Sequence, residues 1–259
     1  MKRYTISFTG AGKVASSFIP GFKTAGFSIK QVVSRNSDKG KRVALSAGAR
    51  WSDTPRFDED TDIIIVAVPD RILESVLGNI SCHRNTIVAH TAGSCGLEIF
   101  PGHIEKKGVF YPLQTFSEGR NVDLKGVPIF IESYDPEVTA VLNELAVSLG
   151  CRPETADVER RRMLHIAAIF VSNFTNYMLT RGYQITRKEG FDPDLLRPLL
   201  TETVAKAIER GPESSQSGPA VRNDYNTIEK HVDLLSFSPE LQTLYEELSR
   251  SIIDYYKKY

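Results

Sequence analysis

The chain has 259 residues, and its 32 Lys and Arg residues balance its 32 Asp and Glu residues. This balance argues against a general affinity for nucleic acid and favours a small-molecule partner. The apolar stretch near the start is interrupted by Gly10 and Gly12, too early for a signal peptide, and no later window reaches membrane-spanning length. We therefore expect a soluble, cytoplasmic protein that binds neither nucleic acid nor membrane.

The three cysteines, Cys82, Cys95 and Cys151, are scattered and show no metal-ligand spacing with the histidines. We expect reduced, structural thiols and no metal site.

Short β-branched runs alternate with amphipathic segments up to about residue 153, which is typical of βαβ units and a mainly parallel sheet. The run 63–68 has no polar face, as expected for a central strand covered by helices on both sides. Pro20 and Gly21 fall inside the first helix, so we expect a kink or an early stop there. The expected strands are 4–9, 29–34, 62–68, 86–91, 108–111 and 127–132.

The remainder of the chain has a helical pattern. A long helix is predicted over 158–183, where there is no Pro and almost no Gly, followed by helices over about 193–210, 225–235 and 239–257. The sequence thus predicts an α/β, Rossmann-type domain over residues 1–153 and an all-α domain over 154–259.

The first strand runs into Gly10-x-Gly12-x-x-Ala15, the sequence form of a dinucleotide-binding turn. Gly10 permits a tight reversal, and Gly12 allows backbone N–H groups to approach a pyrophosphate. Ala15 lets the helix pack closely on the sheet, and Lys13 and Val14 complete the first turn of that helix. The alternative is an ordinary turn without a ligand.

The second strand ends in Ser34-Arg35-Asn36, where an NAD-binding protein carries an Asp or Glu for the ribose. The missing carboxylate and the guanidinium favour NADP(H) over NAD(H), because Arg35 can bind a 2′-phosphate. Lys39, Lys41 and Arg42 add nearby charge. The alternative is a solvated helix start.

Further polar groups follow the ends of later strands, where open α/β sheets bind ligands. Val68 and Pro69 would lie against the cofactor, as would Thr91, and Ser94 and Gln114 would face the substrate. His90 is as readily explained as a half-buried strand-end histidine, and the segment 111–116 as a packed turn.

On the long helix His165, Ile169, Ser172 and Asn176 fall within about 40° of one direction, with Asn173 about 80° away, at about 100° per residue. Such a polar edge would either bond to another helix or face the substrate, with His165 donating a proton or orienting the acceptor.

Between two predicted helices, the segment 217–224 combines a rigid turn with Arg222 and Asp224. Arg222 is a natural anchor for a carboxylate substrate. Asp224 would contribute to the substrate site, although a helix N-cap explains it better than catalysis does. His231 follows one or two helical turns downstream.

Together, the glycine turn, Ser34-Arg35-Asn36, Ala67-Val68-Pro69 and a helical second domain resemble the 6-phosphogluconate dehydrogenase-like superfamily, which includes pyrroline-5-carboxylate reductase. Within it, the segments 111–116, 165–173 and 218–224 resemble Rossmann-like NADP oxidoreductases with a C-terminal domain of unknown function. The resemblance covers nearly the whole chain and implies a homodimer through the C-terminal helices.

Two positions depart from these patterns. Tyr111 stands where the family pattern has His, which weakens a proton-transfer role there, and the long helix lacks the catalytic Lys of β-hydroxyacid dehydrogenases. We expect an NADPH-dependent reductase of a C=O or C=N bond in a small, carboxylate-bearing metabolite, with the site in an interdomain cleft. His165, Asn173 and Arg222 are its candidate catalytic residues. The alternative is a non-catalytic NADP sensor or scaffold.

Overall fold

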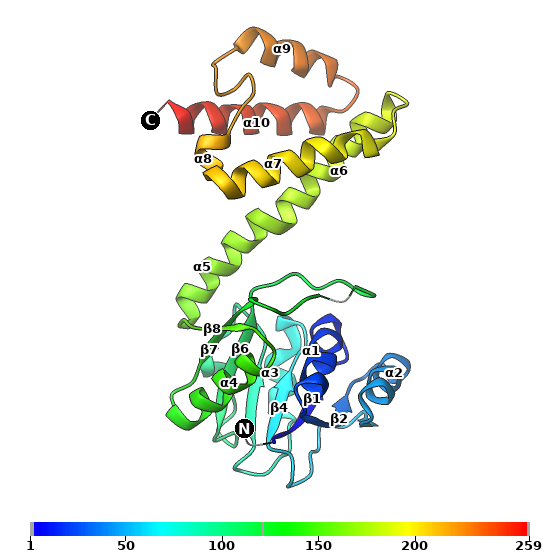
Figure 1. Ribbon diagram of the computed structural model, residues 1–259, viewed down its shortest axis with the longest axis vertical. Coiled ribbons are helices and arrows are strands. Elements are labelled where there is room, and N and C mark those ends of the chain that lie inside the picture. Colours follow the sequence, from blue (N-terminus) through cyan, green and yellow to red (C-terminus); the bar gives the residue numbers. More distant parts are fainter. Residues whose placement is uncertain (1–2, 121, 258–259) are drawn as a thin grey trace. The chain divides into compact units, whose positions relative to one another are not determined.

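The computed structural model describes residues 3–120 and 122–257 (Figure 1). The chain divides between residues 173 and 174 into two compact units. Among the described residues, no helix combines the length and the apolar character needed to cross a membrane.

The first unit is built on an eight-stranded sheet in the order β3-β2-β1-β4-β5-β6-β7-β8. All neighbouring strands are parallel except β6 and β7, which confirms the mainly parallel α/β fold. The direction in which strands are added reverses between β1 and β4, and this is where such sheets bind their ligands. The strands are β1 (Thr5–Thr9), β2 (Ser28–Val33), β3 (Arg50–Ser52), β4 (Ile63–Val66), β5 (Ile87–His90), β6 (Lys107–Pro112), β7 (Pro128–Glu132) and β8 (Arg152–Thr155).

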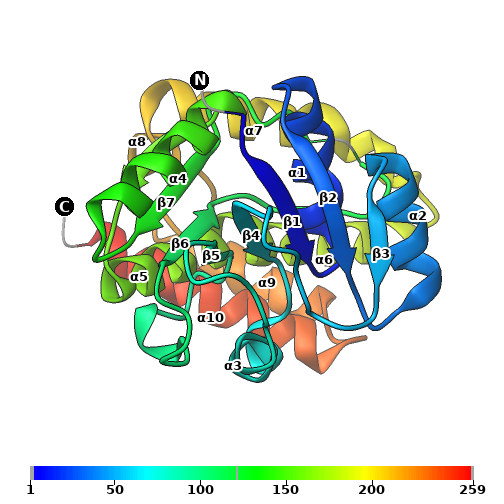
Figure 2. The same ribbon diagram turned by 90° about the horizontal axis from the view of Figure 1, so that it is seen from below.

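Helices cover both faces of this sheet, with α1 and α4 on one side and α3 on the other (Figure 2). A hydrophobic core lies on each face of the sheet, and alternate residues of β4 pack into one or the other, because successive side chains of a strand point to opposite faces. Ile63 and Ile65 pack with α1, α2 and α4, whereas Ile64 and Val66 pack with α3. The helices of this unit are α1 (Lys13–Thr24), α2 (Ser37–Ala47), α3 (Asp70–Gly78), the 3₁₀ turn η1 (Leu97–Ile99), α4 (Pro136–Ser148) and α5 (Val158–Ala168).

Three local features differ from the sequence-based expectation. The first helix does not stop at Pro20 but continues to Thr24. Pro20 lies inside this helix, where it has no N–H to bond to the preceding turn, so the kink expected as the other outcome stays a prediction. Strands β3 and β8 were not expected, because they are short and rich in polar residues or proline.

The second unit is helical, in agreement with the predicted all-α region. Its elements are α6 (Thr175–Lys188), η3 (Pro193–Leu196), α7 (Arg197–Arg210), α8 (Pro212–Ser215), α9 (Tyr225–Leu234) and α10 (Pro239–Tyr256). A π-helical stretch, η2 (Ile169–Phe174), lies between α5 and α6.

The division at residues 173 and 174 lies beyond the expected boundary between residues 153 and 154. The reason is that α5, although helical, is bonded to the sheet of the first unit. Arg161 donates to the carboxylate of Glu132 in β7, and Arg162 donates to the carbonyl oxygen of Ser94 at 2.9 Å.

Candidate functional site

The turn between β1 and α1 has the backbone that its glycines predict. Gly10 has φ of +106°, and a Cβ there would lie 2.1 Å from the carbonyl oxygen of Ala67. Gly12 is different: φ is −81°, and the nearest atom to an added Cβ is 4.0 Å away. The protein itself therefore needs glycine at position 10, whereas Gly12 leaves open space for an incoming group.

The start of α1 is suited to an anion. Gly12 is its N-cap and supplies no capping side chain, and the first turn contains no acidic residue. The N–H groups of Lys13 and Val14 are at the N-terminal end of the helix, where the helix dipole favours negative charge. Ala15 is fully buried against the sheet.

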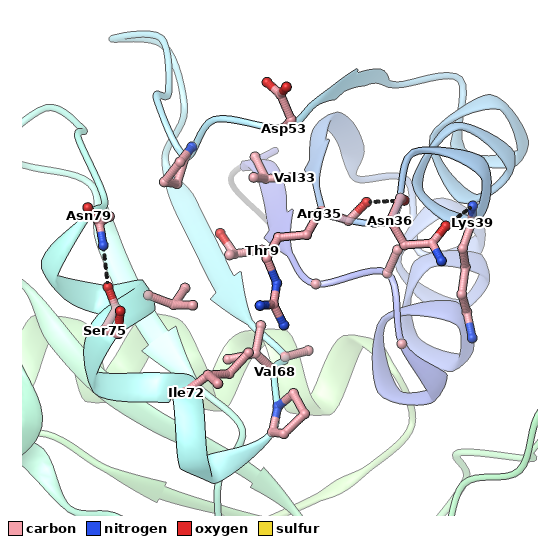
Figure 3. Close-up of a pocket in the computed structure, with 18 residues that line it drawn as sticks. Thr9, Val33, Arg35, Asn36, Lys39, Asp53, Val68, Ile72, Ser75 and Asn79 are labelled. Carbon is pink, nitrogen blue, oxygen red and sulfur yellow. Dashed lines mark hydrogen bonds between the residues drawn. The ribbon is translucent and has the colours of Figure 1, made fainter.

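A cavity of about 810 Å³ opens beside this turn (Figure 3). Its walls come from the carboxyl ends of β1, β2 and β4 and from α3. Thr9 is among the lining residues, and its buried hydroxyl has no hydrogen-bond partner among the described residues. The lining includes Gly10, Gly12, Ser34, Arg35, Asn36, Lys39, Asp53, Val68, Pro69, Ile72, Ser75 and Asn79.

The end of β2 brings positive charge to this cavity. Arg35 is exposed and extends into it, toward Val68 (Figure 3). Its neighbours have structural bonds: Asn36 caps α2 by accepting from the backbone N–H of Lys39 at 2.9 Å, and Ser34 donates to the Asn36 carbonyl oxygen at 2.9 Å. Three residues were predicted to bind the cofactor here. The Arg35 side chain extends into the cavity, whereas Ser34 and Asn36 form hydrogen bonds within the protein.

Trp51 supports the Ser34 side of the cavity. Its indole Nε1 donates to the Ser34 hydroxyl at 3.2 Å, and a Cβ on Gly40 would fall 2.3 Å from that same nitrogen. Asp53, which follows β3, also lines the cavity. Neither residue was predicted, because β3 itself is too short to be recognised from its pattern.

Lys39 lines the cavity but is bonded to another segment. Its ammonium lies 2.8 Å from the carboxylate of Glu118, which follows β6. This hydrogen bond lowers the pKa of Glu118 below its ordinary value, and Arg42 and Lys13 contribute further. Glu118 therefore stays ionised close to the positive groups of the site.

The loop after β5 is fixed by His90, which is fully buried and stacked on Phe100. One ring nitrogen, Nδ1, accepts from the N–H of Ala92 at 3.2 Å, so Nε2 carries the proton toward the carbonyl oxygen of Gly96, 3.3 Å away. Burial lowers the pKa of His90 to about 4. The alternative reading of His90 as a satisfied structural histidine therefore fits the geometry.

The predicted ligand groups of this loop have partners within it. The Thr91 hydroxyl donates to the carbonyl oxygen of Val66 at 3.4 Å, and the Ser94 hydroxyl bonds to the carboxylate of Asp70 at the start of α3. After β6, the amide oxygen of exposed Gln114 accepts from the N–H of Thr115 at 2.7 Å. The sequence placed Asp70 at the end of the buried strand, directly after Pro69, but did not predict its bond to Ser94.

Tyr111 and His165 meet at the same edge of the sheet. The Tyr111 hydroxyl lies 3.1 Å from Nδ1 of His165, so a residue of β6 and a residue of α5 form a hydrogen-bonded pair. Tyr111 is 8% exposed, whereas His165 is exposed. The pattern of the sequence gave no sign that these two residues are partners.

Arg161 holds α5 against this edge. Its side chain is fully buried and donates to Glu132, to the carbonyl oxygen of Ala156 at 2.8 Å and to that of Cys95 at 2.7 Å. A buried arginine with these partners fixes the helix that carries His165 relative to the loop that carries Ser94. It was not predicted because an arginine in the first turn of a helix is usually solvated.

The predicted polar edge of the long helix rests on a regular rotation of 100° per residue, and this assumption is wrong for η2. Residues 169–174 are π-helical, with more residues per turn than an α-helix. Ser172 and Asn173 therefore do not follow His165 at the predicted angles. Asn173 is exposed.

In the second unit, Asp224 accepts from the backbone N–H of Thr227 at 3.1 Å and from its hydroxyl at 2.7 Å. These bonds lower the pKa of Asp224 below its ordinary value, and Asp224 is the N-cap of α9. Arg222 and Asn176 are exposed. His231 accepts or donates a hydrogen bond with the Tyr245 hydroxyl at 2.7 Å.

Comparison with known proteins identifies the family. Residues 5–93 match the family of NADP oxidoreductases described as coenzyme F420-dependent, and residues 127–252 match a domain of unknown function, DUF2520. A Bacteroides fragilis protein, described provisionally as an NADP oxidoreductase, is 35% identical over 97% of this chain and 98% of its own, with a TM-score of 0.87. The chain belongs to this NADP oxidoreductase family. No protein of curated function gives a significant match.

More distant structures share the fold of this chain. An imine reductase from Myxococcus stipitatus in complex with NADP⁺ is 16% identical over 98% of this chain and 93% of its own, with a TM-score of 0.64. A pyrroline-5-carboxylate reductase from Streptococcus pyogenes is 15% identical over 98% of both chains, with a TM-score of 0.62. The resemblance derived from the sequence motifs is thereby confirmed at the level of family and fold.

Proposed function

We propose that this protein is an NADPH-dependent reductase of a C=O or C=N bond in a small, carboxylate-bearing metabolite. The observation that carries the proposal is the cavity beside the glycine turn, which combines the start of α1 with the guanidinium of Arg35. These groups fit a dinucleotide that carries a 2′-phosphate.

The residues divide along the cofactor as follows. The backbone of Gly12, Lys13 and Val14 binds the pyrophosphate, with Gly10 and Ala15 allowing the turn and the close packing. Arg35 binds the 2′-phosphate between Ser34 and Asn36. Val68, Pro69 and Thr91 would hold the nicotinamide half, which would supply a hydride.

Exposed residues are proposed for the substrate by their chemistry: His165 and Asn173 in the first unit and Arg222 in the second. Arg222 anchors the carboxylate, and His165 and Asn173 orient or protonate the acceptor atom. Asn176 belongs to the same proposed set, whereas Ser94, Gln114 and Asp224 already have partners in Asp70, the Thr115 N–H and Thr227. Relatives of the fold that act on carbon–nitrogen double bonds, an imine reductase and a pyrroline-5-carboxylate reductase, support C=N chemistry as one of the two options.

The cofactor is tested by titration calorimetry with NADPH and NADH. A charge-assisted phosphate contact contributes about 1.5–3 kcal/mol, so Arg35→Ala is expected to weaken NADPH binding about tenfold to a hundredfold. NADH lacks the phosphate and is the internal control. Equal or tighter binding of NADH by the wild type would contradict the proposal.

The reaction is tested with NADPH and a panel of oxo-acids and cyclic imines. His165→Ala and Arg222→Ala are expected to lower kcat/KM, whereas Arg197→Ala, which removes an exposed arginine paired with Asp194, is the matched control. If NADPH binds but the two site variants retain wild-type turnover, the assignment of catalytic residues fails. If no substrate turns over, the non-catalytic sensor is the better description.

A homodimer through the second unit is the expected assembly. Exposed apolar side chains of this unit, among them Val204 and Ile208 of α7, would be covered in such an assembly. Sedimentation equilibrium tests this, and Ile208→Glu is expected to give a monomer. The cytoplasmic location expected from the sequence stays a prediction.

A further inference from the structure

Most polar groups at the carboxyl edge of β4, β5 and β6 are already engaged. Both ring nitrogens of His90 are bonded within its own loop, and the Ser94 hydroxyl is bonded to Asp70. The guanidinium of Arg161 has three acceptors in the protein. Within the first unit, the Tyr111 and His165 pair remains as a group that can give up a proton and recover it from solvent.

The position of Tyr111 is set by close packing. A Cβ on Gly93 would lie 2.7 Å from the ring atom that bears the Tyr111 hydroxyl, so the glycine lets the phenol lie directly against the loop after β5. On its other sides the ring meets Phe130, with 6.4 Å between centroids, and His165, with 6.2 Å. The hydroxyl is therefore held beside the strand ends at which the nicotinamide half is proposed to lie.

The environment keeps this phenol protonated. Burial raises the pKa of Tyr111 above its ordinary value, the Asp70 carboxylate raises it further, and the Arg161 guanidinium acts in the opposite direction. A neutral phenol at physiological pH is a hydrogen-bond donor and a general acid. His165, by contrast, is exposed, so water has access to its ring.

We propose that Tyr111 is the proton donor of the reduction and that His165 is the positioning residue that resupplies its proton from solvent. This inference rests on the proposed reductase function. It reverses the expectation that tyrosine at this position weakens proton transfer.

The proton steps balance as follows. When a hydride adds to the carbon of the C=O or C=N bond, the π-electron pair moves to the oxygen or nitrogen, and that atom takes the proton from Oη of Tyr111. A new O–H or N–H bond forms as the Tyr111 O–H bond breaks. A protonated His165 passes its Nδ1 proton to Oη, 3.1 Å away, and the neutral imidazole then takes one proton from water.

The pair is tested first without turnover, by ¹⁵N NMR of histidine-labelled protein at mildly alkaline pH, where free imidazole is neutral. The proposal makes the Tyr111 phenol the donor to the neutral imidazole, so His165 is expected as the tautomer protonated at Nε2. Tyr111→Phe is expected to return it to a mixture of tautomers. The same His165 signals in the wild type and in Tyr111→Phe would overturn the inference.

Tyr245→Phe is the matched control for this experiment. It removes a hydroxyl that lies 2.7 Å from Nδ1 of another histidine, His231, in the second unit. The His231 signals are expected to change and those of His165 to stay as in the wild type.

Turnover of the oxo-acid and cyclic-imine panel then tests whether Tyr111 donates a proton or only holds β6 and α5 together. Tyr111→Phe is expected to lower kcat by about 10²–10⁴-fold with little change in KM. His165→Gln keeps a hydrogen-bonding partner for Tyr111 but cannot resupply a proton, so it is expected to lower kcat with unchanged unfolding. Wild-type kcat in Tyr111→Phe would overturn this inference alone, whereas no wild-type turnover on the panel would overturn the proposed function as well.

Discussion

Replacing Arg161 by leucine is expected to destabilise the first unit strongly. The guanidinium has no solvent exposure, and its ion-pair partner Glu132 is 16% exposed. Arg161→Leu leaves that carboxylate without its counter-charge and removes the donors to the carbonyl oxygens of Ala156 and Cys95.

The expected cost follows from these exposures. Removing one partner of a buried ion pair costs about 3–5 kcal/mol, and the partial access of water to Glu132 puts this case at the lower end, about 3 kcal/mol. With a urea dependence of about 2 kcal/mol per molar, the unfolding midpoint is expected to fall by about 1.5 M. Replacing both partners, in Arg161→Leu with Glu132→Leu, is expected to recover much of the loss because no unpaired charge remains.

Urea unfolding followed by tryptophan fluorescence measures this directly, since Trp51 is the single tryptophan and belongs to the first unit. Lys106→Ala is the control, because its pair with Glu137 is near the surface and such pairs contribute at most about 1 kcal/mol. If Arg161→Leu loses no more stability than Lys106→Ala, the buried ion pair makes no net contribution and the reasoning is refuted.

Three further predictions concern the glycine turn, the buried histidine and the segment after β6. Gly12→Ala is expected to leave the urea midpoint unchanged while weakening both NADPH and NADH binding, since its Cβ enters only the space left for a ligand; a lowered midpoint would contradict this. Burial holds the pKa of His90 at about 4, against an ordinary 6.5. Between these two pH values the unfolded chain binds a proton at His90 that the folded chain does not bind. The free energy of unfolding should therefore fall as the pH drops from 6.5 to about 4. In His90→Gln this loss of stability with falling pH should be smaller by about 3 kcal/mol. The same pH dependence of the urea midpoint in the wild type and in His90→Gln would contradict this prediction. Glu118→Gln frees Lys39 for the 2′-phosphate and is expected to tighten NADPH binding by about twofold to fivefold, with NADH unchanged in the same titration; tightening of both cofactors would instead indicate a general effect on the cavity.

The local sequence was sufficient to predict the mainly parallel sheet and its central strand. The continuous apolar run of β4 identified a strand buried on both faces, and the alternation of runs identified a mainly parallel sheet, because these patterns depend only on which faces of an element are covered. Gly10 was also recognisable, since its backbone conformation and its approach to Ala67 depend on a turn of fixed geometry. The two short strands β3 and β8 were missed because three or four residues carry too little periodicity.

Contacts between distant segments were beyond the reach of the sequence. The Tyr111 and His165 pair joins residues that are 54 positions apart, and the bond from Arg161 to Cys95 joins residues 66 apart. Such partners are chosen by the way α5 packs on the sheet, which no local pattern encodes. For the same reason a regular helix was assumed where η2 is π-helical, and the angles predicted for Asn173 were wrong.

The sequence by itself thus determined the Rossmann-type sheet and the conformation of the glycine turn, since short-range geometry and side-chain periodicity decide these features, and the resemblance of its motifs indicated the family. Only the tertiary structure decided which polar groups are already bonded within the protein and which remain able to act. In the structure His90 is hydrogen-bonded within its loop, and Asn36 and Asp224 cap helices. The phenol of Tyr111 lies beside the imidazole of His165, which depends on packing between segments far apart in the chain.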